Sequence, residues 1–280
     1  ANLVALGIVI HTVSGNAITL EQGIVLGAVI VGIYTLFGGM WSVAFTDLFQ
    51  TVIIVAGLIY IAWMLAGMAG GVDKVVATAQ ASDRLKFFPG ASLHDWLGFI
   101  AAFVTMALGS VAQQDVFQRV TSARTEKIAR QGTLLGGSLY LLMAFIPMFI
   151  AVSALLIDPA MVKQMLSNEN DFQQVLPTLI LQRTPLFAQV LFFGALLSAI
   201  LSTASGTLLA PTAVITENVI QPLWGHKLSD RKMLVLLRLI LIGFTCCVTL
   251  FALQSESSMY HMVQDAYKVT LVAAFTPLVF

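Results

Sequence analysis

Three oxygen atoms along one predicted helix could help to bind a cation. Ser202 and Thr203 are adjacent hydroxyl residues inside the long apolar run 186–221, and a helix places a backbone carbonyl one turn before them. Hard cations such as sodium bind neutral and anionic oxygens, and these three groups could supply part of such a ligand set. Small hydroxyl residues in a membrane helix also allow close helix packing, which is the alternative interpretation and suits the neighbouring Ser198 and Ser205.

The carboxylate of Asp47 is a second candidate for cation handling. It lies early in the apolar run 43–68, shortly after a turn predicted at Gly38 and Gly39. A carboxylate inside a membrane helix costs about 3 kcal/mol or more unless it faces water or a partner. Asp47 could therefore relay a cation on the inward exit path. The alternative is an acid that only favours the start of a helix through the helix dipole.

The composition indicates which elements must position these residues. Hydrophobic residues make up 58% of the 280-residue chain and charged residues 10%, whereas soluble domains carry about 25% charged residues. Apolar runs of about 20 residues recur, and this length crosses about 30 Å of hydrocarbon. We predict an all-α polytopic membrane protein with about eight transmembrane helices, at 1–14, 20–39, 43–68, 94–118, 126–157, 186–221, 231–254 and 259–280.

The connections and the chain ends complete this organisation. The two longer connections, 69–93 and 158–185, are each predicted to hold a short surface helix, at 72–81 and 159–167. The chain has no initiator methionine and ends inside an apolar run, so we expect residues 1–280 to be a single transmembrane domain truncated at both ends. The lipid bilayer is the expected surrounding, and the net charge of zero disfavours nucleic acid as a partner.

Two compact basic clusters predict the orientation in the membrane. Positively charged loops lie on the cytoplasmic side, which places both clusters there and the 69–93 and 158–185 connections outside. The clusters lie two spans apart, so they agree with each other. They consist of Arg119, Arg124, Lys127 and Arg130, and of Lys227, Arg231, Lys232 and Arg238.

Three ordered stretches resemble the sodium:solute symporter family. The stretch at 34–50, YTLFGGMWSVAFTDLFQ, resembles the family string YT-x-x-GG-x-x-x-V-x-x-TD-x-x-Q, which joins two helices. QDVFQR at 114–119 precedes a basic turn, and SAILSTAS at 198–205 leads to ITEN at 215–218, both at the distances typical of the family. The resemblance covers essentially the whole chain and looks closest to the proline-transporter-like and choline-transporter-like branch.

The resemblance implies a LeuT-type fold, which has ten core helices in two inverted five-helix repeats and binding sites near the midplane at broken helices. The eight apolar segments would then be core helices three to ten. Sodium is implied as the coupling ion, bound by the hydroxyls of Ser202 and Thr203 and by the carbonyl of Ala199. The same resemblance places Asp47 on the inward cation pathway.

A candidate substrate wall lies in the segment 94–118. In the family this helix is broken and lines the substrate cavity, and broken helices expose backbone groups only where they line a cavity or are buried in protein. Met106, Ser110 and Gln113 are three or four residues apart, so a regular helix would place them on one face. The alternative for Gln113 is an interfacial residue at the end of a span.

The last segment carries Gln264, Asp265 and Lys268. Asp265 and Lys268 are three residues apart and can neutralise each other, and we favour an ion pair at the outer interface for them. Gln264 matches a sugar-contacting glutamine of the sugar branch, so it joins the candidate substrate residues.

Differences from the choline-transporting and sugar-transporting branches of the family narrow the range of solutes that this protein could carry. Choline-transporting members place a Trp where Gln113 stands, and a quaternary ammonium requires an aromatic cage. Sugar-transporting members place a stacking Tyr where Gly109 stands. An amino acid or a carboxylate remains as the favoured solute by elimination.

The resulting hypothesis is a secondary active transporter in the plasma or inner membrane. It would couple inward sodium flow to uptake of a small polar organic solute by alternating access, with proton coupling also open. The alternative is a transporter-like sensor domain of a membrane signalling protein. An enzyme is not expected, because the sequence has no nucleophile elbow or phosphate loop, and its four histidines lack metal-ligand spacing.

Overall fold

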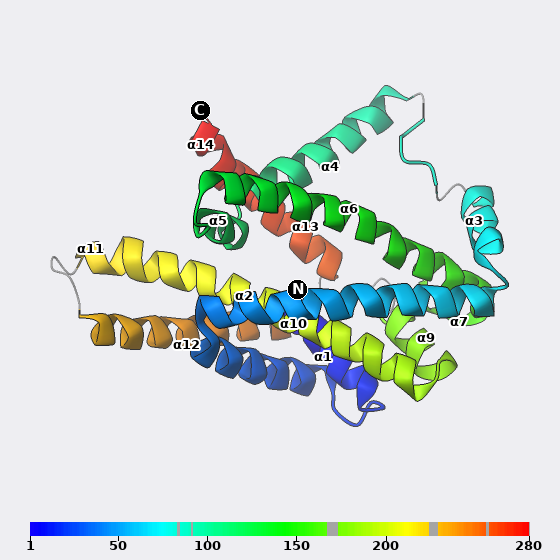
Figure 1. Cartoon of the computed structure of the whole chain (residues 1–280), viewed down its shortest axis with the longest axis horizontal. Coiled ribbons are helices and arrows are strands. Elements are labelled where there is room, and N and C mark those ends of the chain that lie inside the picture. The colour runs from blue at the N-terminus through cyan, green and yellow to red at the C-terminus, as the bar shows by residue number, and fades with distance from the viewer. Residues whose placement is uncertain (83–84, 91, 167–172, 224–228, 256–257, 280) are drawn as a thin grey trace. The chain divides into compact units, whose positions relative to one another are not determined.

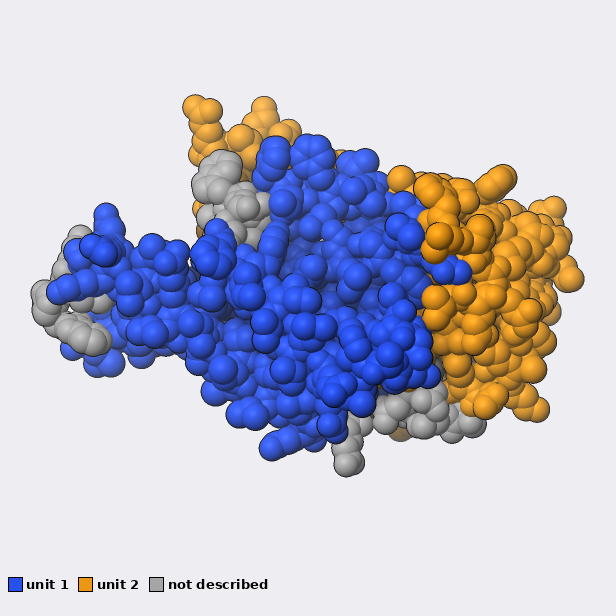
Figure 2. Space-filling model, turned by 90° about the horizontal axis from the view of Figure 1, so that it is seen from below, with its two compact units in different colours: residues 1–54, 189–259 blue, residues 55–188, 260–280 orange. Residues whose placement is uncertain are grey.

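The computed structural model describes residues 1–82, 85–90, 92–166, 173–223, 229–255 and 258–279. Helices form all the regular structure within these ranges. The chain divides into two compact units (Figure 2): unit 1 contains residues 1–54 and 189–259, and unit 2 contains residues 55–188 and 260–280.

Six helical stretches in the described ranges are long and apolar enough to cross a membrane, which confirms the predicted all-α polytopic class. They are Leu20–Phe37, Ala44–Ala69, Leu93–Val111, Glu126–Ile157, Leu186–Leu223 and Asp230–Gln254. The other two predicted spans, 1–14 and 259–280, do not form single long helices in the described residues. The first is the short apolar helix α1 (Asn2–Val13), and the last is divided into α13 (Met259–Thr270), the π-helical turn η2 (Leu271–Phe275) and α14 (Thr276–Val279).

Unit 1 brings the first two helices together through glycines. A Cβ atom added to Gly23 of α2 would lie 2.8 Å from the carbonyl oxygen of Gly7 in α1. Only glycine permits this approach, as is common where membrane helices touch. The unit consists of α1, the first part of α2 (Leu20–Ala69), most of α10 (Leu186–Val214), the π-helical turn η1 (Ile215–Ile220), α11 (Gln221–Leu223) and α12 (Asp230–Gln254).

Helix α2 contains two of the predicted spans. Its backbone is helical over its whole length, yet it doubles back on itself in Figure 1. The two arms correspond to the spans Leu20–Phe37 and Ala44–Ala69. The turn predicted at Gly38 and Gly39 therefore exists between them, although the side chains of residues 38–43 are outside the described set.

Unit 2 contains the broken helix and the surface helices. The short helix α3 (Val72–Ala81) has the predicted bounds, and α7 (Pro159–Leu166) begins at the predicted residue. The last residue predicted for α7, 167, lies outside the described residues. Val75 and Ala79 of α3 pack on Val152 of α6 (Glu126–Ile157), so apolar burial fixes α3 on the end of a span. The remaining elements are α4 (Leu93–Val111), α5 (Gln114–Thr121), α9 (Val175–Arg183), α13, η2 and α14.

Helix α9 was not predicted. It carries Pro177 as its third residue. Proline is compatible with the first turn of a helix, because the first four N–H groups have no intrahelical partner. The 158–185 connection is therefore more helical than the sequence indicated.

Candidate cation and substrate sites

The structure brings two of the three predicted cation ligands into contact on α10. The Thr203 hydroxyl donates a hydrogen bond to the Ala199 carbonyl, with 2.9 Å between the oxygens. Threonine commonly makes this bond to the preceding turn of a helix. Its consequence here is that the two predicted ligand oxygens already lie side by side.

The same helix separates a buried face from an open one. Ala204 and Ser205 are 3% and 0% exposed, whereas Ala199 and Ser202 are half-buried and Thr203 is exposed. The Ser205 hydroxyl donates to the Ser202 carbonyl over 2.9 Å. Packing is therefore the role of Ser205, as expected, while the three candidate ligands lie outside the buried stripe. A hard cation requires oxygen donors, and this donor set fits it.

Asp47 also belongs to unit 1 and is half-buried in the second arm of α2. Its carbonyl accepts a hydrogen bond from the Thr51 hydroxyl over 2.7 Å. The preceding residue, Thr46, lies with its hydroxyl oxygen 2.8 Å from the phenol oxygen of Tyr34 in the first arm. Asp47 therefore follows directly after a side-chain contact that joins the two arms. Tyr34 and Thr46 both belong to the motif at 34–50, but the sequence assigned them no role.

The predicted substrate helix is broken in unit 2, as the resemblance implied. Helix α4 ends at Val111 and α5 begins at Gln114, with Gln113 in an extended conformation (φ −70°, ψ 123°). Met106 is 37% exposed, and Ser110 is half-buried and donates its hydroxyl to the Ala107 carbonyl over 2.8 Å.

The expectation of a single face for Met106, Ser110 and Gln113 needs correction. It assumed a continuous helix, and the spacing rule holds only for Met106 and Ser110 on α4. Gln113 lies in the break, after the last helical residue of α4, so helical periodicity no longer fixes its direction.

The end of α4 is held by α13. The Thr270 hydroxyl donates to the Gly109 carbonyl over 2.9 Å, although the residues are 161 positions apart. The last four carbonyls of a helix lack intrahelical partners, and Thr270 satisfies one of them. A Cβ atom on Gly109 would lie 2.5 Å from the Tyr267 carbonyl oxygen, so the two backbones touch there. Thr270 lies in an apolar run and gave no sequence signal.

The remaining predicted residues of unit 2 lie on α13. Gln264 is half-buried on that helix. The Lys268 ammonium is 2.9 Å from an Asp265 carboxylate oxygen, and the two side chains are 55% and 66% exposed. The predicted ion pair is therefore confirmed. Thr270 joins α13, which carries Gln264, to α4, which carries Met106 and Ser110.

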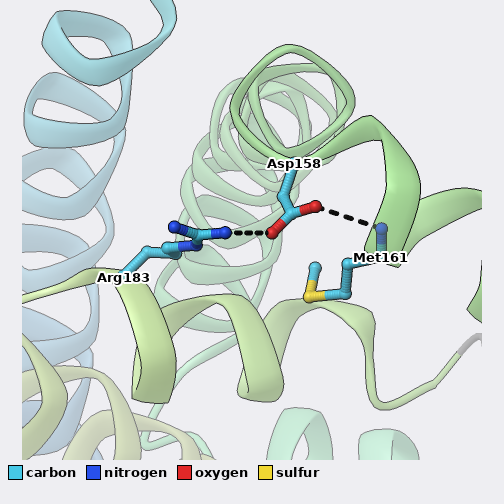
Figure 3. A network of polar contacts seen from close by, with 3 residues as sticks. All are labelled: Asp158, Met161 and Arg183. Carbon is cyan, nitrogen blue, oxygen red and sulfur yellow. Dashed lines mark hydrogen bonds and ion pairs between the residues drawn. The ribbon is translucent and has the colours of Figure 1, made fainter.

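A further polar network lies outside the predicted spans (Figure 3). The Asp158 carboxylate accepts hydrogen bonds from the Arg183 guanidinium over 2.5 Å and from the Met161 backbone N–H over 3.1 Å. The hydrogen bond from Arg183, followed by that from Met161, lowers the pKa of Asp158 below its usual value. The network ties the ends of α6 and α9 to the first turn of α7.

Comparison with known proteins decides the family. The model of the "Sodium:solute symporter family" matches residues 1–280. The chain is a member of the sodium:solute symporter family. This confirms the resemblance found in the three motifs, and it makes the chain a multi-pass membrane protein of a transporter family rather than an enzyme.

Relatives within the family include the proline and choline transporters. The Drosophila melanogaster high-affinity choline transporter 1 is 24% identical over 273 residues, covering 90% of this chain and 41% of the relative. The Bacillus subtilis (strain 168) high-affinity proline transporter PutP is 25% identical over 281 residues, covering 100% of this chain and 57% of PutP. The human sodium/iodide cotransporter is 29% identical over 242 residues, covering 81% of this chain and 36% of the cotransporter. The chain spans about half the length of the curated relatives it matches.

A solved structure supports the fold. A sodium-coupled sialic acid symporter in its substrate-bound outward-open state matches with a TM-score of 0.78. The match has 18% sequence identity and covers 96% of this chain and 58% of that chain. The LeuT-type fold expected for this family is thereby confirmed.

Proposed function

We propose that the full-length protein is a secondary active transporter that couples inward sodium flow to the uptake of a small polar organic solute. The protein would lie in a plasma or inner membrane and would couple sodium entry to solute entry by alternating access. The observation that carries this proposal is the open face of α10. There the Thr203 hydroxyl and the Ala199 carbonyl lie 2.9 Å apart, outside the buried stripe of the helix.

Sodium is supported as the coupling ion by the chemistry of these donors. Ala199, Ser202 and Thr203 offer neutral oxygens, with hydroxyls that can turn their protons away from a cation. Hard cations such as Ca²⁺ and Mg²⁺ take about six or more oxygen ligands, so further oxygens would have to complete the site. Asp47, half-buried beside the junction of the α2 arms, would act on the inward pathway.

An amino acid or a carboxylate is the solute class we favour. A stacking aromatic side chain could not replace Gly109 without moving the α13 backbone, because a Cβ atom there would lie 2.5 Å from the Tyr267 carbonyl oxygen. Gln113, at the break, offers hydrogen bonds but no aromatic face for a quaternary ammonium. Among the relatives, PutP is named as a proline transporter.

Uptake by the full-length protein in proteoliposomes tests the proposal. Labelled proline, other amino acids, carboxylates, choline and sugars would be offered under an inward sodium gradient, and again under a proton gradient alone. We expect an amino acid or a carboxylate to accumulate, and the accumulation to vanish when the sodium gradient is collapsed. Accumulation driven equally by the proton gradient alone would refute sodium coupling, and accumulation of choline alone would refute the solute class.

A further inference from the structure

The N-terminal half of α12 carries arginines on a face that is otherwise apolar and exposed. Arg231 and Arg238 are seven residues apart, so they lie within about 20° of each other around the helix. Val235 lies between them and is 50% exposed, and Ile242, which follows on the same stripe, is 48% exposed. Both arginines are exposed as well. This stripe of four residues is hereafter the α12 face.

Acidic partners are absent from this face in the described part of the chain. The ion pairs Arg183–Asp158 and Lys268–Asp265 lie on other helices. Neither Arg231 nor Arg238 pairs with an acidic side chain of a described residue. Asp230 is adjacent to Arg231 in sequence, but neighbouring helical residues point about 100° apart. The α12 face therefore has a net positive charge.

The depth of Arg238 makes this charge costly in a bilayer. The span Asp230–Gln254 contains both arginines, and Arg238 lies about 10 Å further along the axis than Arg231. An arginine facing hydrocarbon is unfavourable unless its guanidinium reaches the polar headgroup region. In a helix the Cα–Cβ bond tilts toward the N-terminus, and the long, flexible stem of arginine lets the Arg238 guanidinium extend toward the level of Arg231.

Both side chains are long enough to reach a single anionic group near the first turns of α12. The helix dipole adds positive potential at that end. Guanidinium groups bind phosphate oxygens in a bidentate manner, and Val235 and Ile242 continue the stripe with apolar surface suited to an acyl chain.

We propose that the α12 face binds an anionic phospholipid. Arg231 and Arg238 hold its phosphate, and Val235 and Ile242 contact an acyl chain. A lipid with net negative charge fits better than a zwitterionic one, because the face offers two cations and no acidic group to a headgroup amine. Basic pockets at the membrane surface are known to recognise lipids in this way.

The test uses the full-length protein in nanodiscs of phosphatidylcholine, with or without phosphatidylglycerol. We expect phosphatidylglycerol to raise the Tm of the wild-type protein by at least about 3 °C, since a ligand that binds the folded state stabilises it. The double variant Arg231→Gln/Arg238→Gln should lose this rise. Lys74→Gln/Lys163→Gln, which removes two charges from the connections, should keep it. Arg231→Lys/Arg238→Lys should keep part of it, because the charge survives but the guanidinium fork does not.

Native mass spectrometry gives a second readout that does not depend on the variants. The wild-type protein should retain phosphatidylglycerol in preference to phosphatidylcholine after delipidation. Equal Tm values in the two membranes together with no preferential retention would overturn the proposal. A full rise in the Arg231→Gln/Arg238→Gln variant would overturn it too, and would mean that another part of the full-length protein covers the α12 face.

Discussion

The phenol oxygen of Tyr34 lies 2.8 Å from the hydroxyl oxygen of Thr46, twelve residues further along α2. In a straight helix these residues would be separated by about 18 Å along the axis. The contact therefore exists only because α2 doubles back, and it closes the turn from both arms. This gives a physical reason for a tyrosine at the start of the motif at 34–50 and a threonine directly before Asp47.

Removing the Tyr34 hydroxyl should loosen this junction. Tyr34→Phe keeps the ring and deletes one partly buried hydrogen bond, which costs about 1 kcal/mol. We expect a lower Tm of the purified protein and a higher sodium requirement for uptake, because Asp47 follows the contact. Tyr140→Phe is the matched control, since Tyr140 is 79% exposed. Equal effects of the two substitutions would contradict a role for the contact.

Adding one methyl group at Gly109 should disturb the broken helix. The new Cβ of Gly109→Ala would meet the Tyr267 carbonyl oxygen at 2.5 Å, so one backbone must move. Overpacking of this kind costs about 1–3 kcal/mol. Gly98→Ala on the same helix is the control, because a Cβ there meets nothing within 4 Å. Thermal unfolding should separate the two variants, and a Tm for Gly109→Ala as high as that for Gly98→Ala would show that α4 and α13 do not touch there.

The Asp158 network predicts a particular dependence of stability on pH. Hydrogen bonds from Arg183 and Met161 lower the pKa of Asp158 in the folded protein. Their stabilisation is therefore present above the unfolded pKa of about 3.9, and it is lost as the pH falls through the lower folded pKa. The difference in Tm between wild type and Asp158→Asn should be constant from about pH 7 to pH 5 and should shrink below about pH 4.

A double-mutant cycle provides the control for this network. Arg183→Gln should cause a similar loss at neutral pH, and Asp158→Asn/Arg183→Gln should lose less than the sum of the two, because the residues share one interaction. Additive losses, or a wild-type advantage that persists unchanged at pH 2, would exclude the network as the cause.

The orientation of the chain in the membrane can be tested by labelling cysteines from one side. From the basic clusters we predict that residues 120–130 and 222–232 lie on the cytoplasmic side and the connections 69–93 and 158–185 outside. With Cys246 and Cys247 replaced by Ala, a membrane-impermeant thiol reagent applied outside intact cells should label Lys163→Cys and spare Lys127→Cys. Labelling of both from one side would contradict the assignment.

The sequence was sufficient for the features that depend on local patterns. Apolar runs located the spans, and α3 was predicted at its observed bounds because its residues form a short helix between polar turns. That the helix at 94–118 is broken came from the family resemblance rather than from local signals, and the position of the break after Val111 came only from the structure. The periodicity argument then failed at Gln113, because it assumes that the helix continues.

Contacts between distant residues could not be predicted. Thr270 and Gly109 are separated by 161 positions, and nothing local marks a threonine in an apolar run as the partner of a particular carbonyl. The difference between Ser202 and Ser205, in contrast, was expected from the sequence. Burial agrees with it, since Ser205 is 0% exposed and Ser202 is half-buried.

The sodium dependence of uptake by Thr203→Ala tests the central claim most directly. Thr207→Ala is the control, because Thr207 is also exposed on α10 and makes the same kind of bond, 3.0 Å to the Thr203 carbonyl. If Thr203 is a ligand, its loss should raise the half-saturating sodium concentration about tenfold or more, since hydrogen bonds to charged groups contribute about 1.5–3 kcal/mol. Thr203→Ser, which keeps the oxygen, and Thr207→Ala should stay near wild type. A half-saturating concentration for Thr203→Ala equal to that of Thr207→Ala would contradict a cation site on this face of α10.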